Sequence, residues 1–493
     1  MLRSGGADLT IAGGVREFGR ATPAAIAVRD GDRALTYAAL DERSSRLAGA
    51  LLAAGLGTGD RVGLLCGNRL EYPEIAAGIA KAGLVLVPVN PRLTAPEVGF
   101  ILGHSGARLL IADVALAVPE VAVRVVALGD EYERWIAAAP ARDPRVPVDE
   151  RDPFCIAYTA GTTGDPKGVL ISHRSRCLTF YATALEWGLG PGRRTIAVAP
   201  MYHGAGFAFA YAAVHCGATV SMLRSFDPVA LLDLIDRERA QSVFLVPTHA
   251  QLIREAVGTV PALPSLDTLY FNAAALPKVL KEWVFEAFPG AGVHELYGST
   301  EAGVVTNLRP PDARRKAGTV GHPWFATQVR IVGPDGRPVA PGEPGELYSR
   351  SPYLMNGYHE NPAATAACTT EDGFLTSGDI VVADEEGFIS IVDRVKDVII
   401  TGGVNVYPRD VEEVLLTHDA VAEAAVVGEP DGRWGERVVA YLVCRRAIEA
   451  PALDAHLRQR LAGYKVPKEF KVVAALPRNA AGKVLKRELR STP

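Results

Sequence analysis

The sequence lacks the signatures of several protein classes. Its 493 residues hold 52 Lys and Arg against 56 Asp and Glu, so no basic excess favours nucleic acid as the main partner. Its six cysteines lie far apart without a CxxC or Cys/His pair, which argues against a zinc site or a disulfide framework. The N-terminus, MLRSGGADLTIAGG, has no apolar signal core. These absences predict a cytoplasmic protein that binds small molecules.

An uninterrupted apolar run is also missing. Residues 195–223 contain no Asp, Glu, Lys or Arg and resemble a membrane span at first sight. A span needs about 20 consecutive apolar residues, and this segment is interrupted by Pro200, His203, Gly204, Gly206, His215 and Gly217. We expect a buried core beside a site.

The patterns that are present alternate between helix and strand. Leu40, Leu47 and Leu51 share one helical face, and a short strand, DRVGLLC, follows Gly55. The same order recurs with a helix over 229–241 and a strand over 242–247. Such repetition predicts an α/β protein with parallel-rich sheets covered by helices, and the chain becomes turn-rich β after about Asp312.

The stretch YTAGTTGDPKG, from Tyr158 to Gly168, has the composition of a phosphate-binding loop. Backbone amides of a glycine loop can surround an anion, and hydroxyl groups and a lysine add donors and charge. The contributing residues are Thr159, Gly161, Thr162, Thr163, Gly164 and Lys167. It is not a Walker A loop, because Lys167 is followed by Gly168 rather than Ser or Thr. Taken alone, an ordinary turn remains an equal alternative.

Five further segments follow in a fixed order: ELYGSTE from Glu295, GFLTSGD from Gly373, DRVKDVIITGGVNVYPRDVE from Asp393, GEPDGRWGE from Gly428 and PRNAAGKVLKREL from Pro477. With the glycine loop, this set resembles the adenylate-forming (ANL) superfamily of acyl-CoA synthetases, peptide-synthetase adenylation domains and firefly luciferase. The resemblance runs from about Pro23 to the end of the chain.

The resemblance implies a fold and its division. We expect an N-terminal adenylate-forming domain over 1–393, with two parallel-rich sheets and a β-rich subdomain. A small mobile α+β lid domain is expected over 394–493, with a hinge near Lys396. The resemblance also implies ATP (bound later as AMP), Mg²⁺ and CoA as cofactors.

The resemblance assigns roles to residues of the first half-reaction, in which a carboxylate attacks the α-phosphate of ATP. The glycine loop would hold the leaving pyrophosphate, Glu301 would bind magnesium, and Thr300 and Lys483 would contact the reacting oxygens. The AMP moiety would be held by Ala274, Glu295, Tyr297, Gly298, Asp379 and Arg394. In isolation, each of these residues is better explained by a surface ion pair or a cap.

The second half-reaction, thioester formation with CoA, would follow a rotation about Lys396, which brings Gly402 and Gly403 to the pantetheine tunnel. His203 would act as a gate beside the carboxylate, although a lone histidine on an apolar segment is often a core residue. The acid pocket would be lined by 202–210, Thr248, 271–277 and 298–305. Since these segments carry no charged residue besides Glu301, we expect a mainly apolar, bulky acid.

We therefore predict an ATP-dependent acyl-CoA synthetase, an acid–thiol ligase. Ala160 and Ala481 replace hydroxyl residues of many relatives, so adenylation is predicted to be the weaker half-reaction. The alternatives are an enzyme that loads a carrier-protein thiol in trans, a ligase that depends on acyl-AMP from a partner, and a binding or regulatory protein on the same fold. The third alternative would require loss of Glu301, Asp379 or Lys483, and all three are present. The acid, the pathway and the choice between monomer and homodimer are left open.

Overall fold

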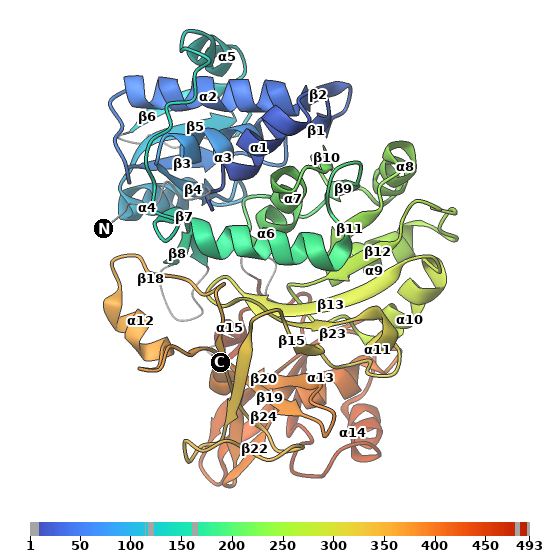
Figure 1. Ribbon diagram of the computed structural model, residues 1–493. Helices are drawn as coiled ribbons and strands as arrows, with labels where there is room; N and C mark the ends of the chain where they lie inside the picture. The colour runs from blue at the N-terminus through green and yellow to red at the C-terminus, as the bar shows by residue number, and fades with distance from the viewer. Residues whose placement is uncertain (1–8, 114, 117–122, 160–165, 479–483, 491–493) are drawn as a thin grey trace. The chain divides into compact units, whose positions relative to one another are not determined.

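The computed structural model (Figure 1) describes residues 9–113, 115–116, 123–159, 166–478 and 484–490. The described residues form two compact units. The first unit holds the residues up to 159 together with 166–328 and 349–375, and the second holds 329–348 and the residues from 376 onward. The predicted domain boundary between residues 393 and 394 stays a prediction.

The first unit contains a large sheet that brings candidate site loops to one edge. In spatial order its strands are β15 (His322–Pro323), β14 (Gly303–Leu308), β13 (Gly292–Ser299), β12 (Thr268–Phe271), β11 (Ser242–Leu245), β9 (Arg194–Ala197), β10 (Thr219–Met222), β1 (Ile26–Asp30) and β2 (Arg33–Thr36). Strands β13 to β1 run parallel, and β14, β15 and β2 are antiparallel to their neighbours. The carboxyl ends of the parallel strands therefore share one edge, which is where ligands bind in open α/β sheets.

A second sheet in this unit contains the ends of the glycine loop. Its spatial order is β18 (Gly357–Tyr358), β8 (Lys167–Ser172), β7 (Pro153–Thr159), β4 (Val85–Val89), β3 (Arg61–Leu65), β5 (Ala107–Asp113) and β6 (Arg124–Leu128). Strands β7 to β6 are parallel, whereas β8 and β18 are antiparallel additions at one side.

Helices form layers around these two sheets (Figure 1). One apolar core joins Val28 and Val220 of the large sheet to Val62 and Ile111 of the second sheet. The helices that contribute to this core are α1 (Gly13–Ala21), α2 (Tyr37–Ala53), α3 (Glu71–Lys81), α5 (Asp130–Ala137), α6 (His173–Trp187) and α7 (Gly204–His215). The outer face of the large sheet is covered by α8 (Pro228–Glu238), α9 (Pro247–Ala256) and α10 (Lys278–Ala287), and that of the second sheet by α4 (Ala95–Ser105).

Helix α5 packs against α2 and β6. The remaining helices of the first unit, α11 (Pro310–Ala313) and α12 (Pro362–Cys368), are short and begin with a proline. The predicted face of α2 is confirmed, since Leu40, Leu47 and Leu51 are fully buried. The strand predicted over 242–247 is shorter than expected and ends at Leu245, because Pro247 begins α9.

The apolar segment 195–223 is a buried core, as predicted. It supplies strand β9, helix α7 and strand β10, and α7 packs against both strands. Among the described residues, the longest and most apolar helices fall short of what a membrane crossing requires. All six cysteines are free thiols.

The second unit holds two sheets. One has the order β16 (Gln328–Val332), β17 (Gly345–Arg350), β19 (Leu375–Ala383) and β20 (Ile389–Arg394). The other has the order β22 (Val404–Val406), β21 (Ile399–Thr401), β24 (Gly435–Cys444) and β23 (Val421–Asp431), with β25 (Glu469–Val472) parallel to β24. Helices α13 (Pro408–Leu416) and α14 (Ala450–Arg458) cover one face of this second sheet, and α15 (Lys486–Arg490) lies on the other. The predicted α/β class, with a large N-terminal part and a small α+β part, is confirmed.

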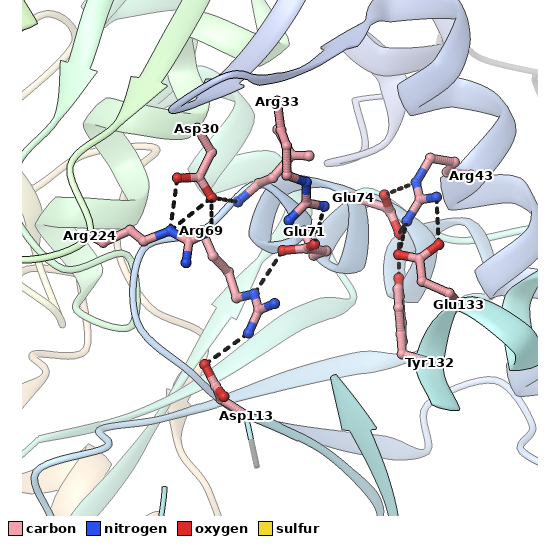
Figure 2. Close-up of polar contacts among 11 residues, drawn as sticks. Asp30, Arg33, Arg43, Arg69, Glu71, Glu74, Asp113, Tyr132, Glu133 and Arg224 are labelled. Atoms are coloured by element: carbon pink, nitrogen blue, oxygen red, sulfur yellow. Dashed lines mark hydrogen bonds and ion pairs between the residues drawn. The ribbon is translucent and has the colours of Figure 1, made fainter. Parts of the chain in front are cut away.

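Helix α3 is buried along its whole length and carries charged groups that must be paired. Figure 2 shows the ion pairs at its N-terminal end. Glu71 accepts hydrogen bonds from Arg69 at 2.7 Å and from Arg33 at 2.5 Å, and Arg69 also contacts Asp113 at 2.8 Å. Glu74 is bonded by Arg43 and Tyr132. These acids lie at the positive end of the helix dipole, so they stabilise the helix as well as its attachment to α2 and the sheet.

The Glu71 pair has a pH-dependent contribution to stability. Burial alone would raise the pKa of Glu71, but hydrogen bonds from Arg69 and Arg33 outweigh burial and lower its pKa to about 2. A carboxylate with a lowered pKa in the folded state adds stability above its unfolded pKa, near 4.5, and loses that contribution as the pH falls toward 2.

We predict that Glu71→Gln lowers the free energy of unfolding by about 3 kcal/mol at pH 7. Urea unfolding between pH 7 and pH 3 measures the free energy of unfolding. The difference in this free energy between wild type and variant should narrow below about pH 4.5. Glu42→Gln, which removes an exposed i,i+4 partner of Arg46, is the matched control and should cost less than about 0.5 kcal/mol. A pH-independent gap would contradict the role given to the ion pair.

Candidate active site

The ends of the glycine loop are fixed by a hairpin in the second sheet. Thr159, the last residue of β7, pairs with Lys167, the first residue of β8, across an antiparallel ladder. The Thr159 hydroxyl donates to the Lys167 carbonyl at 3.5 Å. Ala160, Gly161, Thr162, Thr163 and Gly164 lie outside the described residues. The structure therefore places both ends of the predicted phosphate loop at one point.

Strands β13 and β14 place the second predicted motif. They form an antiparallel pair with an irregular register between Tyr297 and Gly298. A Cβ built on Gly298 would lie 2.0 Å from the carbonyl oxygen of Gly303, so only glycine fits there. Thr300 and Glu301 lie in the turn that follows β13, and Tyr297 is half-buried on the strand before it.

Tyr358 holds Glu301, and sequence analysis did not identify this contact. The Tyr358 hydroxyl donates to Glu301 Oε1 at 3.0 Å, and the Met355 amide donates to the Glu301 carbonyl at 2.8 Å. Burial and the Glu301 charge raise the pKa of Tyr358, so its hydroxyl keeps the proton that it donates. The ammonium of Lys167 lies 4.9 Å from the centre of the Tyr358 ring. Tyr358 thus joins the predicted metal ligand to the predicted phosphate lysine.

Glu301 has the chemistry of a magnesium ligand that is shared with phosphates. Its carboxylate offers hard oxygen donors, and Oε2 has no hydrogen bond to any described residue. Within the described ranges, no three His, Cys, Asp or Glu side chains gather to form a metal site. This donor set suits Mg²⁺, which binds through one or two carboxylates plus substrate phosphates.

The loop after β12, which contains Ala274, is tied to strand β13 through Glu295. This carboxylate is 4% exposed, forms an ion pair with the buried Lys281, and accepts a hydrogen bond from the Leu276 amide at 3.1 Å. Ala273 has φ of +76°, a conformation that is costly for a residue with a Cβ. Strain of this kind is concentrated at functional sites, which agrees with a ligand-binding loop here.

His203 lies at the N-terminus of α7, at the shared edge of the large sheet. Its ring is exposed, yet desolvation by the surrounding protein and the nearby charge of Arg92 lower its pKa, so the imidazole is neutral at pH 7. A Cβ built on the next residue, Gly204, would lie 3.7 Å from Thr300 Oγ1. The structure therefore brings the residue after His203 next to Thr300. The nearby Arg92 was missed, because its segment lies about 110 residues upstream.

In the second unit, Asp379 and Arg394 form a cross-strand pair between β19 and β20. Arg394 Nε lies 3.0 Å from Asp379 Oδ1, and the Ser377 hydroxyl donates to Asp379 Oδ2 at 2.7 Å. The carboxylate is buried but orientated by these two donors. The adjacency that the sequence predicted for these two residues is present.

Lys396 lies in a single 3₁₀ turn, Val395–Asp397, between β20 and β21. The buried Asp393 fixes the strand before this turn, since it accepts hydrogen bonds from the amides of Arg394 at 2.7 Å and Arg409 at 2.9 Å. Because Arg409 is the second residue of α13, the end of β20 and the start of that helix are held together. The exposed Lys396 is thus the middle of a short connection between fixed elements.

Gly402 and Gly403 form the two-residue turn of the β21–β22 hairpin, with φ of +58° and +80°. The Gly402 amide donates to the Trp434 carbonyl at 2.8 Å, and a Cβ at Gly402 would come within 2.9 Å of the Trp434 ring. Two motifs that are 30 residues apart in the sequence therefore meet in this unit. Lys483 and Ala481 lie outside the described residues.

Comparison with known proteins decides the family. The AMP-binding enzyme family model matches residues 15–359, and the model of the AMP-binding enzyme C-terminal domain matches 410–483. The chain belongs to the AMP-binding enzyme family. A feruloyl-CoA synthase from Amycolatopsis is 39% identical to this family member over 477 residues, which cover 96% of each chain.

Solved structures agree with this assignment. One is o-succinylbenzoate CoA synthetase from Bacillus subtilis in complex with its acyl-adenylate intermediate, with a TM-score of 0.89, 30% identity, and coverage of 97% of this chain and 98% of that one. Another structure of that enzyme, in complex with ATP and a magnesium ion, covers 97% and 99% at a TM-score of 0.89 and 30% identity.

The predicted resemblance to adenylate-forming enzymes and the predicted enzyme class, an acid–thiol ligase of the acyl-CoA synthetase type, are confirmed. The roles of the individual site residues stay predictions.

We predict that Tyr358→Phe weakens the use of magnesium by this ligase. Loss of the hydroxyl releases Glu301, and changes to groups that orientate a metal ligand typically cost about 10- to 100-fold in metal affinity or activity. The measurement is the Mg²⁺ concentration that gives half-maximal ATP–pyrophosphate exchange. Tyr348→Phe is the matched control, because Tyr348 also donates to a glutamate, Glu346 at 3.3 Å, in the second unit. Equal magnesium dependence in the two variants would contradict the proposed hold on Glu301.

Proposed function

We propose that this acyl-CoA synthetase joins a bulky, mainly apolar carboxylic acid, aromatic acids included, to the thiol of CoA through an acyl-AMP intermediate. The observation that carries the proposal is the grouping of Lys167, Tyr358 and Glu301 at the end of the glycine loop, with Thr300 beside Gly204, the residue after His203. ATP, Mg²⁺ and CoA are its cofactors. The amino-acid side chains supply positioning and charge, which dominate catalysis of transfers at phosphorus.

The first step is the attack of the acid's carboxylate oxygen on the α-phosphorus of ATP. A carboxylate–phosphorus bond forms, the bond to the bridging oxygen breaks, and pyrophosphate leaves with the electron pair. Lys167, Thr159 and the loop between them would hold the leaving pyrophosphate, and Thr300 would donate to the α-phosphate. When bound to Glu301, Mg²⁺ supplies charge neutralisation for the phosphates. Lys483 would contact the reacting oxygens.

Further residues are assigned to the AMP moiety of the nucleotide. In the first unit, Tyr297 would stack on adenine, with Ala274, Glu295 and Gly298 beside it. The ion pair of Glu295 with Lys281 supports a role for this carboxylate in fixing the loop of Ala274. In the second unit, Asp379 would accept hydrogen bonds from the ribose hydroxyls, with Arg394 orientating its carboxylate.

The second step is the attack of the CoA thiol on the acyl carbon of acyl-AMP, which releases AMP. Lys396 would be the pivot for the lid domain predicted over 394–493, and its place in a short turn after a fixed strand supports this. Gly402 and Gly403 would then face the pantetheine arm. Their tight turn is a rigid element without side chains, as a narrow tunnel requires.

The apolar character of the acid follows from the surroundings of α7. This helix is rich in Gly and Ala, and Phe209 on it packs against Trp187, Phe244 and Tyr270. The rings of Trp187 and Tyr270 stack at 4.2 Å. This cluster of aromatic side chains, packed beside the small residues of α7, supports a pocket for a rigid, planar acid. A cytoplasmic location stays a prediction, with the free cysteines in agreement.

A panel of carboxylic acids tests the proposal. The purified protein is incubated with each acid, ATP, Mg²⁺ and CoA, and mass spectrometry follows acyl-AMP and acyl-CoA separately. We expect both products from aryl or bulky apolar acids. Acyl-CoA formed only from added acyl-AMP would favour the partner-dependent alternative, and transfer only to a phosphopantetheinylated carrier protein would favour carrier loading. The absence of acyl-AMP with every acid would contradict the proposal.

The same assay separates the two half-reactions. In Lys396→Pro, which restricts the backbone at the proposed pivot, acyl-AMP should accumulate while acyl-CoA falls about 10-fold or more. The matched control is Lys396→Ala, which removes the side chain without restricting the backbone. Lys468→Pro is unsuitable, because it would remove the hydrogen bond from the Lys468 amide to the Val438 carbonyl. Equal loss of both products in the proline variant would exclude the pivot role.

A further inference from the structure

A small, mainly apolar cavity that includes a few polar groups lies behind His203 within the first unit. It is bounded by α3, the start of α6, the N-terminal end of α7 and strands β4 and β7. Phe154, Phe207 and Leu86 form apolar walls, and His203 and Gly204 also line it. Because Gly204 lies against Thr300, this cavity begins within a few ångströms of the groups that face the reacting carboxylate.

Two buried donors in this cavity lack acceptors. Arg176 is 8% exposed, and its Nε is enclosed without a hydrogen-bond partner among the described residues. No described acid forms an ion pair with Arg176. Tyr72 is fully buried, and its hydroxyl is likewise unpartnered within the part of the chain that the structure describes. Buried polar groups are normally hydrogen-bonded, so two such groups in one cavity point to an acceptor that is not part of the protein.

The charge of Arg176 is not balanced by its neighbours. Burial lowers the pKa of Arg176, which shows the cost of enclosing this cation. The nearby Cys155 cannot serve as a counter-ion, because burial raises its pKa to about 12 and the thiol is neutral at pH 7. An oxygen with negative charge or a strong dipole would satisfy the guanidinium best.

The size of the cavity limits what can enter. About 10 Å³ is open to the centre of a water molecule, which is room for roughly one water. The occupant is therefore a single oxygen atom at the tip of a larger group, and a whole ring does not fit. Water would fill the cavity in the free enzyme, and a ligand oxygen that reproduces its hydrogen bonds would displace it without loss.

We propose that Arg176 and Tyr72 form an acceptor subsite for a second oxygen function of the acid substrate, such as a carboxylate, carbonyl or phenolic oxygen. The inference rests on the proposed function, because the rest of the acid must occupy the region between His203 and Thr300. It refines the expectation of an acid that is apolar apart from its carboxyl. The body of the acid stays apolar, and one further oxygen is recognised.

The test compares acids that share a skeleton and differ in one oxygen group: cinnamic acid and its hydroxy and carboxy derivatives at each ring position. Acyl-AMP formation gives kcat/KM for each acid with wild type, Arg176→Met, Arg176→Lys and Tyr72→Phe. The preference of an enzyme variant is the ratio of kcat/KM for the preferred oxygen-bearing acid to kcat/KM for cinnamic acid. Arg176→Met should lower this ratio by about 10-fold or more. Arg176→Lys should recover part of this preference, and Tyr72→Phe should lose part of it.

Several outcomes would overturn the subsite. One is that Arg176→Met lowers kcat/KM equally for all acids while Tyr72→Phe leaves the preference among acids unchanged. The role of the arginine would then be structural. Another is a rise in the KM for CoA with no change in acid preference, which would place a CoA oxygen in the cavity. If wild type makes acyl-AMP from none of the acids, the proposed function fails instead. If Arg176→Met does not fold, the Tyr72→Phe variant decides.

Discussion

The parallel order of β9, β11, β12 and β13 is the constraint on which the candidate site depends. Each strand ends at the same edge of the large sheet, so the segments that follow them converge although they are spread over about 100 residues of sequence. One of these segments carries His203, another Ala274, and a third carries Thr300 and Glu301. Buried side chains such as Glu295 then fix the loops to the strands. The proposed substrate chemistry would thus be performed by loops whose positions the sheet determines.

Polar side chains orientate the carboxylates of the candidate site. In the first unit Tyr358 donates to Glu301 and Lys281 pairs with Glu295, and in the second unit Arg394 pairs with Asp379. In each case a carboxylate that faces a proposed ligand is held by a donor, which lowers the cost of burying it. Arg176 Nε and the Tyr72 hydroxyl differ, because they are buried and have no hydrogen-bond partner among the described residues. This contrast separates the donors that hold carboxylates of the candidate site from the donors that we propose bind an oxygen of the acid.

The sequence predicted the fold class, the family and the motif positions because those features are local. The spacing of Leu40, Leu47 and Leu51 indicated a helix in the α/β alternation. A tight turn with positive φ requires glycine at 402 and 403. Tyr358, Arg92 and Arg176 were missed, because their roles come from tertiary contacts with residues far away in the chain. The expectation of a pocket without charged residues besides Glu301 stays a prediction, and Arg176 was not considered in it because α6 was not among the segments assigned to the pocket. Ala160 and Ala481 lie outside the described residues, so the proposed weakness of adenylation rests on the sequence alone.

The central claim is that the acid is activated as an acyl-adenylate, and the fate of its carboxylate oxygen tests this most directly. A turnover with ATP, Mg²⁺ and CoA is run with an accepted acid whose carboxylate carries heavy oxygen, and the products are weighed by mass spectrometry. Attack on the α-phosphorus followed by thiol transfer leaves one labelled oxygen in AMP. We predict this result. Label found in inorganic phosphate instead, or AMP without label, would contradict the acyl-adenylate route.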